Sequence, residues 1–250
     1  MISLKSTLLA AGALAGAANA DKALAQSAVP FSKHDIYFEL NATDGDIGLH
    51  GILDGDSWKV ATIRGPGGAF NVLRAVPNQA SPEFGMTELF FESNEPPLEE
   101  RSFAELITLF PPGVYDFVGK RAEDNAPMFA QDVLSAAMPC PPVVPTPKII
   151  DGDLMMRWRP RAGSYDPDTG VCSTGSAVSV AAYQIVVELE DTQSGFVRKF
   201  SADLPPGARR IETPDELLLG VNPSTTEAKA EVLVIAPDGN RTAIEVEFDL

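Results

Sequence analysis

The sequence predicts a mainly β protein made of two β-rich domains, and three observations support this. Short runs alternate apolar and polar residues, as at 36–40 and 182–188. Turn-forming residues are frequent, with 20 Gly and 21 Pro. A helical period is found in one stretch alone, residues 102–110. Period-two runs separated by Gly and Pro are typical of short strands joined by turns.

Residues 1–20 are expected to be a signal peptide. Lys5 precedes an apolar run at 7–18, and Ala18, Asn19 and Ala20 form a small-residue cleavage site. The alternative is a membrane anchor, but a bilayer span needs about 20 apolar residues. A second small-residue site at 23–25 leaves the cleavage position open. The sequence therefore predicts a bacterial protein exported to the periplasm or secreted, with a loose leader at 21–33.

The composition excludes several classes of partner. The formal net charge of −16 repels nucleic-acid phosphates and anionic headgroups. The apolar fraction of 44% is too high for a disordered chain. We expect no nucleic-acid partner and no membrane insertion after signal cleavage, whereas a protein or carbohydrate partner stays open.

The first domain is expected at 34–138. Strand patterns lie at 36–40, 47–53, 58–62, 70–76, 87–92, 114–118 and 129–136. Turn residues fill 41–45 and 65–68. Asp54 and Gly55 predict a tight hairpin, because a type I′ turn needs the positive φ that this pair tolerates.

One helix is predicted inside this domain. Ser102 and Glu105 have the spacing of a capping box. An apolar stripe follows, consisting of Phe103, Leu106, Ile107 and Phe110. Pro111, Pro112 and Gly113 end the helix. A core helix packed on the first sheet is favoured over a partner-binding helix.

A proline-rich segment, 139–147, is the predicted domain boundary. Five of its residues are Pro, which favours a stiff, extended connection. The segment could equally be the edge strand of the next domain, where Pro is tolerated. The second domain is therefore expected at 139–250.

The second half resembles a fibronectin type III domain. Pro142 and Pro145 match its proline-rich first strand, and 153–160 matches its second, with Trp158 at the core tryptophan position. Runs 182–188, 232–240 and 243–248 resemble later strands, although Ala230 stands where the family usually has Tyr. The resemblance implies an immunoglobulin-like β-sandwich with no chemistry of its own.

The strand around Trp158 has an apolar and a basic row. Leu154, Met156 and Trp158 share one face by the two-residue period, and Arg157 and Arg159 take the other. This pattern is what a sandwich strand needs, so Trp158 is predicted to be a core residue.

Cys140 and Cys172 are predicted to form a disulfide. Export permits the bond, and the pair matches no zinc pattern. Two free buried thiols are the alternative. The fibronectin type III resemblance implies that the start of the domain and the long loop 161–179 lie at one pole, so that Cys140 can reach Cys172.

The whole chain also resembles a group of uncharacterised exported bacterial proteins in which a β domain precedes such a sandwich. The stretches that carry this likeness are 38–46, 53–58 and 86–93. The likeness implies an organisation and no activity.

The motifs of enzymes are weak. No G-x-S-x-G elbow is present, and the two histidines, His34 and His50, are expected to be packed or solvated. Glu88 and Glu92 share a strand face but lie about 13 Å apart along it, more than the carboxyl separation of a glycosidase. Residues 65–68 lack the Lys-Ser/Thr ending of a phosphate-binding loop.

Calcium is the cation that the turns suggest. Asn41, Asp44 and Asp46 cluster in one turn, and Asp54 and Asp56 flank the next. Calcium takes oxygen ligands of this kind, but the EF-hand spacing is absent and these are also ordinary turn residues.

We therefore assign no catalytic, cofactor-binding or metal-ligating residue and no cofactor from the sequence. The leading hypothesis is a non-enzymatic binding or interaction protein. The alternatives are a calcium-dependent surface or carbohydrate-binding protein and a hydrolase that uses acidic residues of the first domain.

Overall fold

A computed structural model describes residues 28–76, 84–175 and 177–250. The predicted signal peptide and residues 21–27 of the predicted loose leader lie outside these ranges. The leader prediction is wrong for residues 28–33, because Val29 and Pro30 pair with a neighbouring strand and Phe31 is buried. The fold is mainly β, as predicted, and its single α-helix within the described residues is α2 (Phe103–Leu109). No helix in the described part of the chain is long and apolar enough to cross a membrane.

The chain divides into two compact units that do not follow chain order. The first unit takes residues up to Asp35, Gly51–Phe91 and Gly113–Val133, and the second takes Ile36–His50, Glu92–Pro112 and Leu134–Leu250. The last change of unit lies close to the predicted proline-rich boundary. Residues 36–50 and 92–112, however, belong with the C-terminal half. The division into independently folding domains at residue 139 stays a prediction.

The first unit is a β-sheet around strand β3. β1 (Val29–Pro30) pairs with β7 (Pro127–Leu134) in parallel, and β6 (Gly113–Arg121) pairs with β3 (Asp46–Arg64) antiparallel. β4 (Asn71–Ala75) and β5 (Met86–Glu92) also pair with β3. The buried side chains of this unit include Trp58, Ile63, Tyr115, Phe117 and Met128.

The hairpin predicted at Asp54 and Gly55 is wrong, because β3 runs through both residues without a turn. Ser32 N donates to the Asp54 carbonyl over 2.8 Å. A Cβ on Gly55 would lie 3.3 Å from the Phe31 ring and 3.5 Å from the Met128 methyl group. Neighbouring segments therefore hold this pair extended, and packing overrides its local turn preference.

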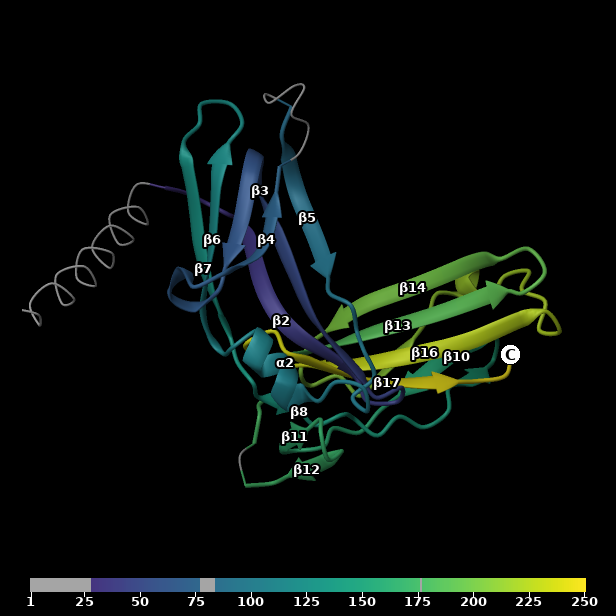
Figure 1. The fold of residues 1–250 in the computed structure, drawn as a ribbon. Helices are drawn as coiled ribbons and strands as arrows, with labels where there is room; N and C mark the ends of the chain where they lie inside the picture. Colours follow the sequence, from purple (N-terminus) through teal and green to yellow (C-terminus); the bar gives the residue numbers. More distant parts are fainter. Residues whose placement is uncertain (1–27, 77–83, 176) are drawn as a thin grey trace, which may run out of the picture. The chain divides into compact units, whose positions relative to one another are not determined.

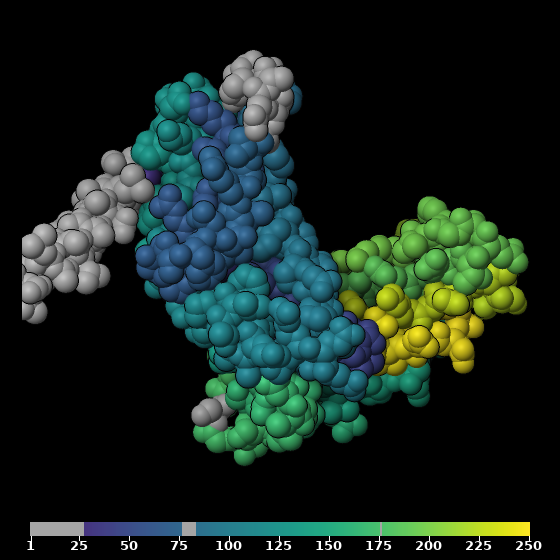
Figure 2. Space-filling model, viewed as in Figure 1, coloured from purple at the N-terminus to yellow at the C-terminus, as the bar shows by residue number. Residues whose placement is uncertain are grey.

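The second unit contains a β-sandwich. One sheet has the order β14 (Phe196–Leu204), β13 (Ala182–Asp191), β16 (Thr226–Ile235) and β17 (Arg241–Glu247), and Figure 1 shows these strands side by side. In Figure 2 the atoms of the same part of the chain are coloured green to yellow. The other sheet has the order β15 (Arg210–Glu212), β10 (Asp153–Arg157) and β9 (Lys148–Ile150). Two antiparallel sheets with this strand order form an immunoglobulin-like sandwich of the fibronectin type III kind, which confirms the predicted fold class.

The core of the sandwich lies between the two sheets. Leu154, Met156 and Trp158 meet Tyr183 and Ile185 there. Trp158 is 2% exposed, and its ring lies 5.5 Å from that of Tyr183. The prediction that Trp158 is a core residue is confirmed. Ala230, at the position where the family usually has Tyr, is fully buried.

A segment from the N-terminal half extends this sheet. β2 (Lys33–Asn41) pairs in parallel with β17, with Glu39 opposite Arg241 and Leu40 opposite Thr242. The edge of the sandwich at β17 is therefore covered by a strand about 200 residues away in the sequence. This pairing explains why residues 36–50 belong to the second unit.

The helix α2 is fixed at its N-terminus in two ways. Ser102 and Glu105 form the predicted capping box. Asp168 also accepts hydrogen bonds from Phe103 N and Ala104 N, at 2.5 and 3.1 Å. The Phe103 ring meets Phe38 of β2 edge-on, with centroids 5.3 Å apart. The predicted core role of this helix is confirmed.

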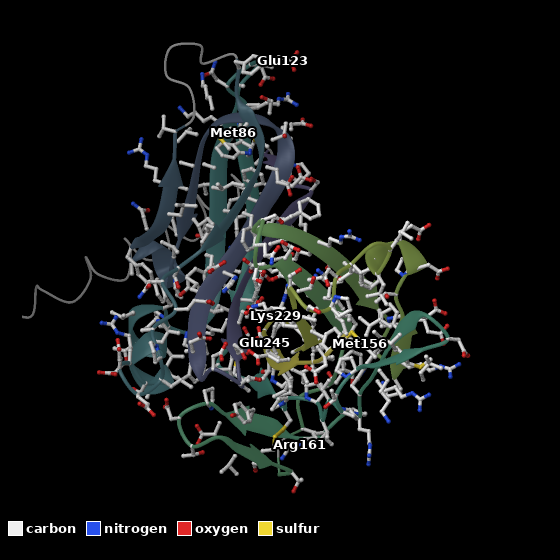
Figure 3. All side chains as sticks on the ribbon, turned by 90° about the vertical axis from the view of Figure 1, so that its right-hand side faces the viewer. Met86, Glu123, Met156, Arg161, Lys229 and Glu245 are labelled. Atoms are coloured by element: carbon white, nitrogen blue, oxygen red, sulfur yellow. A yellow bond between two sulfur atoms is a disulfide. The ribbon has the colours of Figure 1, made fainter. Side chains whose placement is uncertain are left out.

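The predicted disulfide is present. Cys140 and Cys172 are bonded, with Cα atoms 5.7 Å apart, and Figure 3 shows the yellow bond near the labelled Arg161. The bond joins the proline-rich segment to β12 (Val171–Ser173), which pairs with β11 (Ser164–Asp166), and β11 pairs with β8 (Met138–Pro139). The disulfide therefore anchors the loop that carries Asp168.

Candidate metal centre

Three side chains of the second unit bring metal-binding atoms together. His50, Glu92 and Glu95 each offer one ligand atom, and these atoms all lie within 4.8 Å of one another. His50 Nε2 lies 2.6 Å from Glu95 Oε1. The imidazole is buried, Glu95 is half-buried and Glu92 is exposed. The cluster thus has a fixed nitrogen ligand on the inside and a carboxylate open to solvent.

Backbone pairing holds the two ligand-bearing segments together. Ser93 N donates to Leu49 O, and Leu49 N donates to Ser93 Oγ, both over 2.9 Å. Leu98 N donates to Gly45 O further along. These bonds place Glu92 and Glu95 beside His50, although 45 residues separate Glu95 from His50 in the sequence.

Gly48 makes room for Glu95. A Cβ on Gly48 would lie 2.6 Å from Glu95 Cγ and 2.7 Å from Glu95 Oε1. Heavy atoms do not approach this closely without bonding, so any other residue at position 48 would displace the carboxylate. The missing side chain of Gly48 therefore allows Glu95 to reach His50.

An aromatic stack fixes the histidine ring. The Tyr37 and His50 rings stack with centroids 5.6 Å apart and planes inclined by 22°. Arg241 Cζ lies 4.1 Å from the Tyr37 ring centroid, a cation–π contact. Arg241 Nη1 in turn lies 3.7 Å from Glu39 Oε2. This packing holds the imidazole plane in place, as a metal ligand requires.

Two carboxyl groups near the cluster feel its negative charge. Burial raises the pKa of Glu39 above its ordinary value; His50 and Arg241 lower it, whereas Glu95 and Glu92 raise it further. The pKa of Asp46 is also raised, first by burial and then by Glu95 and Asp44. A divalent cation would offset this mutual repulsion of carboxylates, because it is the largest local charge in any site that holds one.

The acidic region continues along β16 and β17. Burial and the neighbouring Glu245 raise the pKa of Glu231 to about 7. Lys229 Nζ lies 3.2 Å from Glu245 Oε2, and Figure 3 labels both side chains. The charge of Glu245 is thus balanced by Lys229, whereas ionisation of Glu231 is unfavourable in the folded protein.

We expect Glu231→Gln to stabilise the protein at pH 8. The folded-state pKa of Glu231 lies above its unfolded value of 4.5, so its contribution to stability is fully present below pH 4.5 and is lost as the pH rises through about 7. Gln carries no such charge. The variant should gain of the order of 1 kcal/mol over the native protein at pH 8 and nothing at pH 4. Urea unfolding at both pH values measures this, and an equal effect at both would contradict it.

The residues considered for calcium have other partners. Asn41 Nδ2 donates to Asp44 Oδ2 over 2.8 Å, and Asn41 Oδ1 accepts from Thr43 N over 2.9 Å, which closes the predicted turn. Asp54 and Asp56 belong to the first unit. There Asp56 pairs with Arg121 at 3.0 Å, and Asp54 accepts from Ser32 Oγ.

The other residues singled out in the sequence divide between the units. His34 belongs to the first unit, where its ring meets Phe117 edge-on with centroids 6.0 Å apart. Glu88 also belongs to the first unit, whereas Glu92 joins the cluster in the second. The sequence gives no reason to join His50 with Glu92 or Glu95, because the two segments lie about 45 residues apart and no local motif connects them.

Comparisons with known proteins identify no family. Neither a family model nor a curated protein matches the chain. The FN1–FN3 domains of chicken CNTN1 align with 12% identity and a TM-score of 0.31, covering 90% of this chain and 68% of that one. A tandem repeat from the extending region of a large adhesion protein aligns with 13% identity and a TM-score of 0.26, covering 87% of this chain and 49% of that one. A 1.5-MDa bacterial ice-binding adhesin aligns with 11% identity and a TM-score of 0.24, covering 89% of this chain and 65% of that one. TM-scores this low carry no argument, so the fold assignment rests on the strand order.

Proposed function

We propose that this chain is an exported, non-enzymatic binding protein whose second unit holds a divalent cation at His50, Glu92 and Glu95. The observation that carries the proposal is the convergence of one imidazole and two carboxylates within 4.8 Å. The exposed Glu92 leaves the cation accessible, so that an oxygen of a protein or carbohydrate partner could complete its coordination. The disulfide supports secretion or a periplasmic location, because such bonds persist in oxidising compartments.

The ligand set favours zinc or manganese over calcium. Calcium takes six to eight oxygen ligands, whereas an imidazole nitrogen with carboxylates suits zinc and other transition metals. Ligands on a tetrahedral zinc ion at about 2.0 Å are about 3.3 Å apart. The 2.6 Å between His50 and Glu95 is a hydrogen-bond distance, so the two side chains would separate slightly to admit the ion.

The non-enzymatic part of the proposal rests on the surroundings of His50. Its Nε2 lies 2.6 Å from the Glu95 carboxylate, a pairing of nitrogen and oxygen donors that suits a metal ion. The Tyr37 ring stacks on the imidazole and keeps its plane fixed.

We expect zinc or manganese to raise the melting temperature of the native protein. A ligand that binds the folded state at 100 times its Kd stabilises it by about 2.7 kcal/mol, or roughly 5 °C or more for a chain of this size. His50→Gln and Glu95→Gln should abolish most of this shift. His34→Asn, which changes the other histidine, should retain it. Differential scanning calorimetry with zinc, manganese, calcium and magnesium measures the shifts.

Two results would count against this function. A rise in melting temperature with calcium alone that persists in His50→Gln would indicate that the cation binds at the acidic turns and not at His50. Hydrolysis of a glycoside or ester substrate that is lost in His50→Gln would contradict the non-enzymatic role.

A further inference from the structure

A second candidate binding site lies on the sheet formed by β9, β10 and β15. A hollow of about 470 Å³ opens there. Its apolar lining includes Pro145, Ile150 and Met155. Its basic lining is Lys148, Arg157, Arg159 and Arg209, all of them exposed. The hollow therefore combines apolar surface with four cations.

These cations lack carboxylate partners. Within the described residues, none of the four lies in an ion pair. Arg209 Nη1 donates instead to the carbonyls of Pro206 and Ala208, at 2.8 and 2.5 Å. Asp and Glu outnumber Lys and Arg by 35 to 19 in this chain. The lining of the hollow has the opposite balance, with four basic residues and no acidic one.

The strand register sets like charges against each other. Arg157 lies directly opposite Arg210 in the antiparallel pair of β10 and β15. Like charges at opposed positions destabilise a sheet. Glu212 is the nearest acid in this register, opposite Met155, and it does not line the hollow. An anion bound beside these bases would offset this repulsion between like charges.

We propose that this hollow binds an amphipathic anion, a small molecule with an apolar body and a carboxylate or similar head group. The body would cover Pro145, Ile150 and Met155, and the head group would meet the guanidinium groups of Arg157 and Arg159. Guanidinium groups bind carboxylates through two parallel hydrogen bonds. Ligand pockets typically have about 300–1,000 Å³ and few charged groups on apolar walls, so the volume suits this class. The site is separate from the cation centre and does not depend on it.

Isothermal titration calorimetry with three probes tests the chemistry. Decanoate carries both features, acetate only the charge, and decan-1-ol only the apolar chain. The full-length protein at low ionic strength should bind decanoate at least tenfold more tightly than either of the other two. Added salt should weaken the binding, because these charges are exposed. Equal binding of acetate or decan-1-ol, or no binding of decanoate, would overturn the proposal.

Matched variants locate the site. Arg157→Gln/Arg159→Gln should weaken decanoate binding at least tenfold. Arg64→Gln/Arg74→Gln removes the same charge from exposed positions in the first unit and should leave binding unchanged. If the first variant has a lowered melting temperature, Lys148→Gln provides a second test and should weaken decanoate binding several-fold. Unchanged affinity in both hollow variants would refute the assignment, as would attachment only to vesicles of anionic phospholipid without binding of monomeric decanoate.

Discussion

Trp158→Ala should destabilise the protein by about 3–5 kcal/mol, the range for truncation of a large core side chain. Trp158 is 2% exposed and packs against Tyr183, between the two sheets of the sandwich. Removing the indole leaves a cavity that Leu154, Met156 and Ile185 cannot fill, because they already occupy the same core.

Urea unfolding followed by circular dichroism measures this loss. The neighbouring Arg157→Ala is the control, because Arg157 is exposed on the same strand. It should change the free energy of unfolding by less than about 0.5 kcal/mol. Similar stability of Trp158→Ala and the native protein would show that the indole does not support the sandwich.

Asn240→Ala should cost at least about 3 kcal/mol, since it would leave several buried polar groups without partners. Asn240 is fully buried. Its Oδ1 accepts from Phe38 N over 2.9 Å, and its Nδ2 donates to Ser135 O and Ala137 O at 3.1 and 3.0 Å. One side chain therefore joins β2, the segment before β8, and the turn between β16 and β17.

The matched control for Asn240 is Asn222→Ala. Asn222 is exposed, and its side chain accepts from Ser224 N within a turn, so its loss should cost about 1 kcal/mol or less. Asn240→Asp should behave like the alanine variant, because it keeps the acceptor but loses both donors. Equal stability of the Asn240 and Asn222 variants would contradict the proposed role of Asn240.

Features set by local sequence were predictable. The capping box of Ser102 and Glu105 satisfies backbone groups within one helical turn, so its pattern alone indicates it. The burial of Leu154, Met156 and Trp158 follows from the two-residue period of a strand with one buried face. The disulfide was also predictable, because two cysteines permit only one intramolecular pairing.

Two Asp-Gly pairs show where local reasoning fails. Asp151 and Gly152 adopt φ values of 54° and 100° and form the two-residue turn between β9 and β10. The turn predicted at Asp54 and Gly55, in contrast, does not form, and both residues are extended within β3. The dipeptide is the same in both places. The two places differ in the segments that pack against the dipeptide, and these neighbours cannot be identified from the local sequence.

The cation centre depends on contacts between distant segments, so the sequence did not reveal it. His50 meets Glu95 because the bonds between Leu49 and Ser93 align two separate stretches. Asp168 accepts a hydrogen bond from Phe103 N at the start of α2, although the two residues are 65 positions apart in the sequence. The pairing of β2 with β17 likewise had no local signal. Each of these contacts requires the fold before the residues can be recognised as partners.

Anomalous X-ray scattering from crystals soaked in zinc can show directly whether the cation centre exists. Data collected on both sides of the zinc absorption edge locate the ion independently of its effect on stability. We expect a peak about 2.0–2.2 Å from His50 Nε2 and from carboxylate oxygens of Glu92 and Glu95, and no such peak in Glu95→Gln crystals. A native crystal without a peak beside His50, or with zinc only at the turn of Asp44 and Asp46, would contradict it.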